Sequence, residues 1–446
     1  MKKPRLKGNC VLWGCLAITL VAAGCMYSTW RKARNFGVVK VSTILPAKGR
    51  PTDSEISPDG AQVAMLYGAM HPGAGLSQGI EVRDVKSGRE EGSTVLPTAG
   101  RMRGKRQYTA LRRLRYCDGG KYLLAVTFPD MLFVIDAHTL QVHGSISMSD
   151  LQAFSAGPDP RRYADALFLG RVDVDCSAES NVAVVVAWGD LDLLSVKLFN
   201  LDTVTEVTDL ASVLFKGHDR YSGNGLAISP DGTKIAMVVH KLLGGRGGEV
   251  AELIGPSSRT IVGGLDLGEA FYDVHQLAFA GNGALMIGLR ECELGWSCRP
   301  QTIPKGQTLR VWQFAGDGRV QTLGWTDAEA DRSFGASSNG DRVFAYTGIE
   351  SFCKSCNTSG ELKIKDARFT VWDRSSGRPI ARSPSLKIQM HPCPRFQLMG
   401  SCSEREDAPS IEMSENGKTI LVFTPGILPA ERNSTDTGEV NIFNVQ

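Results

Sequence analysis

Short apolar runs recur along the whole chain, and each one follows a polar turn. The turn is clearest in Ile56-Ser57-Pro58-Asp59-Gly60 and returns almost unchanged in Ile228-Ser229-Pro230-Asp231-Gly232. Looser copies end at Gly120, Ser180, Gly283, Gly340 and Gly417. A repeated unit of roughly 50 to 80 residues is typical of repeat architectures, so the chain is read as seven similar units.

The turn and the apolar run after it predict a β-hairpin. Proline fixes φ, aspartate can accept a hydrogen bond from the backbone two residues on, and glycine tolerates positive φ. The apolar runs lie at 63–67, 122–128, 182–188, 235–239, 285–289, 343–346 and 420–423. They are too short for helices and too uniformly apolar for strands with one exposed face. We therefore expect strands buried on both faces, as in small sheets that stack on one another.

A second pattern of strand and polar turn follows in each unit. It is clearest at 82–88, 133–136 and 371–377, looser at 198–200, 311–313 and 442–444, and weakest near 250–254. The two patterns together resemble the WD-repeat family and related bacterial propellers, including the Ser-Pro-Asp-Gly repeats of periplasmic Tol-associated proteins and the YVTN surface-layer repeats. The resemblance covers residues 36–446 and implies an all-β, seven-bladed β-propeller.

The two ends of this region predict how the ring closes. The last unit stops at Val445-Gln446, directly after its third strand, and residues 36–45 form an apolar segment before the first unit. We expect the segment 38–44 to pair with 439–445, complete the last blade and leave no open sheet edge. A pair of β-sandwiches is the alternative fold, but it does not explain the sevenfold period.

Residues 1–34 have the pattern of an export signal or membrane anchor. Basic residues precede the uncharged run 11–24, which ends in Ala22-Ala23-Gly24-Cys25. This ending resembles a bacterial lipoprotein box with Cys25 as the lipidated residue, although that family prefers leucine at the position of Ala22. An uncleaved anchor over 11–30 and free secretion are the alternatives. All three interpretations place the propeller outside the cytoplasm, on the periplasmic or cell-surface side.

The cysteine content agrees with export. Eight cysteines follow the leader, and an even number in an oxidising compartment favours disulfides. Three candidate pairs are close in sequence: Cys292 with Cys298, Cys353 with Cys356, and Cys393 with Cys402. Cys117 and Cys176 occupy nearly equivalent inner turns of adjacent units and could link two blades. A zinc site or a redox-active Cys353-Lys354-Ser355-Cys356 is the alternative, but neither a βαβ context nor a spaced histidine accompanies that motif.

Connections of variable length are all expected on one face of the propeller, opposite the short turns. Loop-rich faces of repeat scaffolds commonly carry the binding function, so we expect a protein or another envelope macromolecule to bind there. The chain has 50 Lys and Arg against 47 Asp and Glu, but seven of the basic residues lie in 1–34, which leaves 43 basic residues and a net charge of −4. The pI therefore says little about partners.

One stretch of the chain concentrates basic residues without an acidic one. It comprises Arg101, Arg103, Lys105, Arg106, Arg112, Arg113 and Arg115. This stretch could bind an anionic lipid, polysaccharide or protein, or it could be a solvated connection. Nucleic acid is disfavoured as a partner, because export is expected and no aromatic residues are interleaved with the basic ones.

No catalytic, metal-binding or cofactor-binding set is predicted. Gly75-Leu76-Ser77-Gln78-Gly79 matches the nucleophile motif of α/β-hydrolases, but it joins two expected β-strands, and the chain has no α/β domain. Five histidines expected toward the loop-rich face lack metal-ligand spacing. The sequence thus favours a membrane-anchored, non-enzymatic binding scaffold. The alternative is a propeller enzyme of the lactonase or quinoprotein dehydrogenase type, with its site at the central channel.

Overall fold

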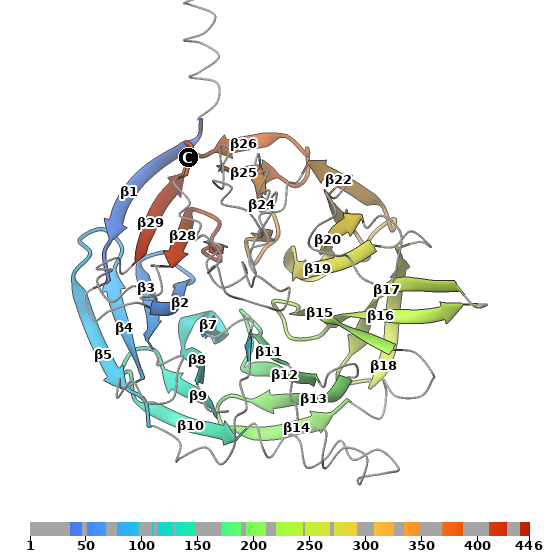
Figure 1. Cartoon of the computed structure of the whole chain (residues 1–446), viewed down its shortest axis with the longest axis horizontal. Helices are drawn as coiled ribbons and strands as arrows, with labels where there is room; N and C mark the ends of the chain where they lie inside the picture. The colour runs from blue at the N-terminus through green and yellow to red at the C-terminus, as the bar shows by residue number, and fades with distance from the viewer. Residues whose placement is uncertain are drawn as a thin grey trace, which may run out of the picture.

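Seven antiparallel β-sheets surround a central channel in the computed structural model of the chain (Figure 1). The structure describes residues 36–46, 51–67, 78–97, 109–110, 114–127, 131–147, 171–188, 193–210, 220–243, 246–267, 272–291, 307–324, 334–347, 368–386, 410–425 and 438–446. Apart from two short 3-10 turns, η1 (Asp118–Gly120) and η2 (Gly281–Gly283), these residues form strands, turns and their connections. The predicted all-β, seven-bladed propeller is confirmed.

The blades have four strands in chain order from the channel outward, but blade 3 has an additional inner strand and blade 7 takes its outer strand from the N-terminal side of the chain. Blade 1 comprises β2 (Pro51–Ile56), β3 (Gln62–Tyr67), β4 (Gly79–Asp84) and β5 (Glu90–Val95), and blade 2 comprises β7 (Leu114–Cys117), β8 (Tyr122–Thr127), β9 (Met131–Asp136) and β10 (Val142–Ser147). Blade 3 comprises β11 (Arg171–Cys176), β12 (Val182–Trp188), β13 (Leu193–Asn200) and β14 (Thr205–Asp209). Blade 4 comprises β15 (Arg220–Ile228), β16 (Ile235–Leu243), β17 (Arg246–Gly255) and β18 (Thr260–Asp266).

The remaining blades follow the same order around the ring. Blade 5 comprises β19 (Tyr272–Phe279), β20 (Leu285–Glu291), β21 (Gln307–Trp312) and β22 (Val320–Gly324), and blade 6 comprises β23 (Phe334–Ala336), β24 (Arg342–Thr347), β25 (Arg368–Asp373) and β26 (Pro379–Arg382). Blade 7 comprises β27 (Ser410–Met413), β28 (Thr419–Pro425), β29 (Gly438–Val445) and, as its outer strand, β1 (Val38–Ile44).

The ring is closed by pairing of the two ends of the described chain. Strand β1 lies antiparallel to β29, with Val38 opposite Val445 and Ile44 opposite Val440. Figure 1 shows β1, at the blue end of the colour bar, beside β29 at the red end. Ile44 is buried in the apolar cluster between blades 7 and 1. The closure predicted from the sequence is therefore confirmed between the expected segments, with a β-bulge between Lys40 and Ser42.

The recurring turn owes its shape to a small set of hydrogen bonds. In blade 1 the Ser57 hydroxyl donates to the Asp59 carboxylate at 2.6 Å and accepts the Gln62 amide at 2.9 Å. The Asp59 carboxylate also accepts the Ala61 amide, while Gly60 has φ of +75°. The turns at Ser229, Ser337 and Ser414 repeat the serine contacts. Serine, an Asx residue and glycine recur because each meets a separate requirement of this turn.

The apolar core lies between the blades. In the described part of the chain it forms seven clusters, and each combines residues from two adjacent blades. The second and third strands of each blade are therefore buried on both faces, which explains their continuous apolar runs. Because the seventh seam joins blades 7 and 1, ring closure completes the core as well as the edge of the last sheet.

Hydrogen bonds also join neighbouring blades along the inner strands and at the tight turns. The Asp53 carboxylate accepts the amide of Leu114 at 3.0 Å, and Asp175 accepts the amide of Ile228 at 3.1 Å. Between blades 2 and 3 the Asp118 amide donates to the Ser177 carbonyl at 3.0 Å. The Asn282 side chain accepts the Asp231 amide, and the Gln276 amide donates to the Phe334 carbonyl. Bonds of Ser338 to the Glu415 carbonyl and of Asn416 to the Asp59 carbonyl complete the ring of hydrogen bonds between the seven blades.

A disulfide adds a covalent link to one of these seams. Cys117 ends β7 and Cys176 ends β11, and the two are bonded with a Cα–Cα distance of 5.7 Å. Both are buried between blades 2 and 3. The predicted inter-blade bridge is confirmed. The other six cysteines of the predicted pairs (Cys292, Cys298, Cys353, Cys356, Cys393 and Cys402) lie outside the described residues, as does Cys25.

One element has no counterpart in the repeat pattern. Strand β6 (Thr109–Ala110) runs parallel to β11 and gives the sheet of blade 3 a fifth strand on its inner edge. Thr109 pairs with Arg171 and Ala110 with Val172. Two residues are too few to show hydrophobic periodicity, so this strand is not predictable from the sequence. In the part of the chain that the structure describes, no helix has the length and apolarity to span a bilayer.

Candidate functional site

The innermost strands present one side chain each to the channel at the same register position. This position lies two residues before the serine of the turn or its equivalent. Its occupants around the ring are Glu55, Arg115, Asp175, Ala227, Ala278, Gly335 and Glu412. The charged residues come from blades 7, 1, 2 and 3, which are consecutive, and the small residues from blades 4, 5 and 6. The ring thus has a charged arc and a small, neutral arc.

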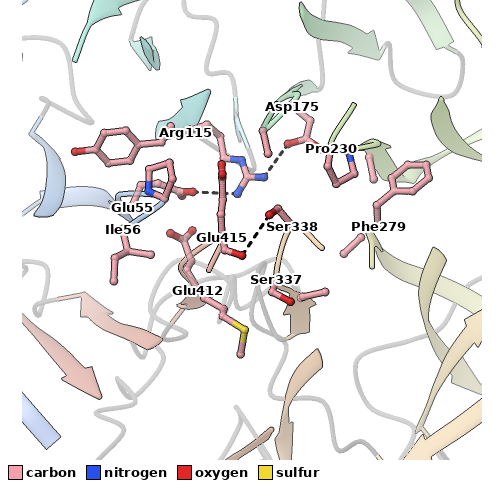
Figure 2. A pocket seen from close by; sticks show the side chains of 18 of the residues that line it. Glu55, Ile56, Arg115, Asp175, Pro230, Phe279, Ser337, Ser338, Glu412 and Glu415 are labelled. Carbon is pink, nitrogen blue, oxygen red and sulfur yellow. Dashed lines mark hydrogen bonds and ion pairs between the residues drawn. The ribbon is translucent and has the colours of Figure 1, made fainter. Parts of the chain in front are cut away.

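A cavity of about 140 Å³ lies at this level, at the tight-turn end of the channel. All seven blades contribute to its lining, through the ends of the inner strands and the turns that follow. The charged arc adds Glu415 from the turn of blade 7, and Phe279 and Ala336 extend the neutral arc. Figure 2 shows the charged side chains converging on this space.

Arg115 is the central cation of the charged arc. Its guanidinium contacts the Glu55 carboxylate and the Asp175 carboxylate, each at 3.1 Å, from the blades on either side (Figure 2). Burial disfavours the charge of Arg115, but the two carboxylates outweigh this effect, so the pKa of the guanidinium lies above its usual range. Because Asp175 also accepts the Ile228 amide, this charged chain links blades 1, 2, 3 and 4.

Glu415 has a carboxyl group with a raised pKa at the edge of the cavity. Partial burial raises its pKa to about 7 from 4.5; Arg115 opposes this shift, whereas Glu179 and Glu55 add to it. The Glu415 backbone carbonyl accepts the Ser338 hydroxyl at 3.3 Å, but no described residue donates a hydrogen bond to its carboxyl group. Glu415 therefore carries a proton in about half of the molecules near neutral pH, which is unusual for a glutamate.

The raised pKa predicts a pH-dependent stability effect of Glu415→Gln. Between its unfolded pKa near 4.5 and its folded pKa near 7, the folded state holds a proton that the unfolded state has lost, so Glu415 contributes less stability as the pH rises. We expect the variant to gain about 1 to 2 kcal/mol at pH 8, allowing for partial exposure, and almost nothing at pH 4. Urea unfolding at both pH values measures this. Glu91→Gln, at an exposed site on β5, is the matched control, and equal gains at both pH values would contradict the prediction.

The structure places one residue of the basic stretch inside the channel. Arg115 belongs to β7 and forms ion pairs within the charged arc, and the nearby strand β6 also lies at the inner edge. Arg101, Arg103, Lys105, Arg106, Arg112 and Arg113 lie outside the described residues, so the proposed anionic-partner patch stays a prediction for them. The basic stretch therefore leads into the channel at its C-terminal end.

Sequence reasoning did not single out Glu55, Asp175, Glu412 or Glu415. Aligning the repeats on their turns, and reading the column two residues before the serine, would have revealed the uneven charge of the ring. Among the described residues, no group of three His, Cys, Asp or Glu side chains has an arrangement that could hold a metal ion. The Gly75–79 string lies partly outside the described residues, and Gly79 begins the strand β4.

The chain was compared with family models, curated proteins and solved structures, and only solved structures resemble it. No family model matches the sequence, and no curated protein matches it. Among solved structures, Kuenenia stuttgartiensis hydrazine synthase matches 86% of this chain and 94% of its own at 13% identity, with a TM-score of 0.46. The β-propeller domain of Myceliophteria thermophila Cps50 (Swd1) matches 92% of this chain and 100% of its own at 12% identity, with a TM-score of 0.47. Neither likeness identifies a ligand or an activity for this chain.

Proposed function

We propose that the protein is an extracytoplasmic propeller, attached to a membrane through its N-terminus, whose loop-rich face binds a protein or another envelope macromolecule. The main support for this proposal is the distribution of short and long connections between the two faces of the ring. Turns between first and second strands and between third and fourth strands are short, as in Ala336–Arg342 and Asp373–Pro379. The long connections, such as those from Thr347 to Arg368 and from Arg382 to Ser410, all leave the opposite face. A closed, stiff ring that offers long connections on one face is suited to binding a large partner.

The position of β1 supports this orientation. Strand β1 begins at Val38, opposite Val445, and the Val445 amide donates to the Lys418 carbonyl in the tight turn of blade 7. The chain therefore enters β1 at the tight-turn end of the ring. An anchor in 1–34 would then attach beside the tight turns, and the loop-rich face would point away from the membrane.

Export and the bacterial repeat type are parts of the same proposal. The disulfide between Cys117 and Cys176 supports an oxidising compartment, because such bonds are rare in the cytosol of most organisms. The repeated turn with serine, an Asx residue and glycine supports kinship with exported bacterial propellers.

Cys25 remains the proposed lipidation site. Incorporation of labelled palmitate into the wild type but not into Cys25→Ser would support lipidation, and a mature protein that retains residues 1–24 would contradict it.

A photo-crosslinking experiment tests the proposed binding face. A photoreactive amino acid at Met131 or Arg368, which start the third strands at the loop-rich face, should crosslink a macromolecule in intact cells. The same group at Lys86 or Lys418, exposed residues in tight turns, is the matched control and should crosslink little. Equal crosslinking from both faces, or crosslinking only from the tight turns, would overturn the proposal.

The second candidate function is a propeller enzyme with its site in the channel. One observation favours it: the carboxyl group of Glu415, with a pKa of about 7, lies beside a cavity, and a group with that pKa can exchange protons at neutral pH. A substrate converted by the wild type, with kcat reduced at least 100-fold by Glu415→Gln, would establish the enzyme. A binding scaffold predicts that Glu415→Gln leaves capture of the macromolecular partner unchanged, because Glu415 lies at the opposite end of the ring.

A further inference from the structure

The channel cavity has two chemically different sides. Among the described residues of the charged arc, four carboxylates (Glu55, Asp175, Glu412 and Glu415) accompany one cation, Arg115, so negative charge is in excess there. On the neutral arc, Ala227, Ala278 and Gly335 stand where the other blades carry charged side chains. Because alanine and glycine fill so little of the channel, they leave open space opposite the carboxylates.

The size of the cavity limits what it can hold. A dry cavity of about 150 Å³ can admit a molecule the size of benzene, and this cavity measures about 140 Å³. A ligand of about five or six heavy atoms therefore fits. The small residues of the neutral arc provide an apolar wall for a short carbon chain.

The surroundings of Glu415 indicate which functional group of a ligand would lie against the charged arc. Its carboxyl group lines the cavity and receives no hydrogen bond from the described residues, although it is partly buried. Desolvating a carboxylate without a donor is unfavourable, and a charged donor that entered the cavity would relieve this. Since Glu55 and Asp175 already share Arg115, the unmet requirement for a cation is greatest beside Glu415.

We propose that this cavity binds an alkylammonium group, with its carbon chain against Ala278 and Gly335 and its nitrogen donating to Glu415. Among the described lining residues, carboxylates outnumber the single guanidinium, so an anion is disfavoured. The ammonium could belong to a free amine or to a lysine side chain of a partner, because both present the same short chain and charge. The site is separate from the proposed loop-rich binding face.

Binding should be linked to loss of a proton from Glu415. The charged groups around its carboxyl are Arg115 on β7, Glu55 on β2, Glu179 in the turn after β11, Asp175 on β11 and Glu412 on β27. With Arg115 already paired to two carboxylates, the ammonium adds the positive charge that ionises Glu415. With a folded pKa near 7, the ionised fraction falls about 10-fold from pH 8 to pH 6, so the affinity should fall by the same factor.

Calorimetric titration of the purified full-length chain with n-butylamine tests the site. We expect saturable binding at one site, about 10-fold weaker at pH 6 than at pH 8. Butyrate and n-butanol, which match the chain length without the positive charge, should bind at least 10-fold more weakly. Failure of butylamine to bind at pH 8, or equal binding of butanol, would overturn the proposal.

Two variants test the Glu415 carboxylate and the open space opposite it separately. Glu415→Gln should weaken butylamine binding about 10-fold at pH 8 and abolish its pH dependence, while Glu91→Gln should change neither. Ala278→Leu adds volume on the neutral arc without changing charge and should block binding in a chain that still unfolds cooperatively. Unchanged affinity in either variant would contradict the site.

Titration with peptides distinguishes the two possible sources of the ammonium group. A short peptide with a central lysine, compared with the same peptide carrying acetyl-lysine, reports on a side chain presented by a partner. Binding of the lysine peptide with the pH dependence of butylamine assigns the site to a partner's side chain. Binding of butylamine alone assigns it to a free amine.

Discussion

Replacing residues 38–44 by a glycine–serine segment of equal length should open the ring and destabilise the whole propeller. The substitution removes the partner of β29 and the buried side chain of Ile44. The lost strand pairing and apolar burial together correspond to about 5 kcal/mol or more. The exposed edge of β29 should also promote aggregation and proteolysis. Thermal unfolding, size-exclusion chromatography and limited proteolysis measure these effects.

The same replacement at residues 26–32 is the matched control, because it precedes β1. It should leave the midpoint of thermal unfolding unchanged. Val39→Pro probes the strand with a single residue, since proline removes a backbone donor and disfavours a paired strand. A glycine–serine variant at 38–44 that stays monomeric and melts cooperatively at the wild-type temperature would show that β1 does not close the ring.

Loss of the Cys117–Cys176 bond should produce the second large effect. The bond closes a loop with a sequence separation of 59 residues, and closing a loop of this length in the unfolded chain corresponds to about 4 kcal/mol. We expect Cys117→Ala with Cys176→Ala to lower the free energy of unfolding by about that amount. Alanine avoids placing two hydroxyl groups in the buried seam between blades 2 and 3. Urea unfolding under non-reducing conditions measures the difference.

Two comparisons make this result specific. Reduction of the wild type with dithiothreitol should bring its stability close to that of the double variant. Replacing Cys292 and Cys298 by alanine should have a smaller effect, because any bond between them closes a much shorter loop. A double variant at Cys117 and Cys176 that unfolds at the wild-type urea concentration would contradict the stabilising role of this bond.

The architecture could be predicted because its determinants are local and repeated. Four of the turns share serine, an Asx residue and glycine at the same spacing, and looser copies in the other three blades reinforce the pattern. The strand at 38–44 was predictable as a partner for the last unit, because that unit has three strands of its own and a propeller closes by completing its last blade. The Cys117–Cys176 bridge followed from near-equivalent positions in adjacent repeats.

The channel site was harder to predict because its residues meet only when the ring closes. Glu55 and Glu412 are far apart in the chain, yet blades 1 and 7 are neighbours. Arg115 was grouped with the basic residues before it, since they are contiguous in the sequence. Strand alternation instead turns its side chain toward the channel, between Glu55 and Asp175. Being contiguous with the basic residues therefore does not predict where the Arg115 side chain lies, because Arg115 is already part of a strand.

The most direct test of the closed ring is a crosslink between its two ends. Val39 lies opposite Asn444 in the pairing of β1 with β29, and both side chains are exposed. In Val39→Cys with Asn444→Cys, directly opposed cysteines are within disulfide range, and peptide mass mapping under non-reducing conditions should find them joined. Lys40→Cys with Asn444→Cys should give little crosslink, because adjacent residues of a strand point to opposite faces. Absence of the Val39–Asn444 crosslink, or equal yields from both pairs, would contradict closure of the propeller by its N-terminal strand.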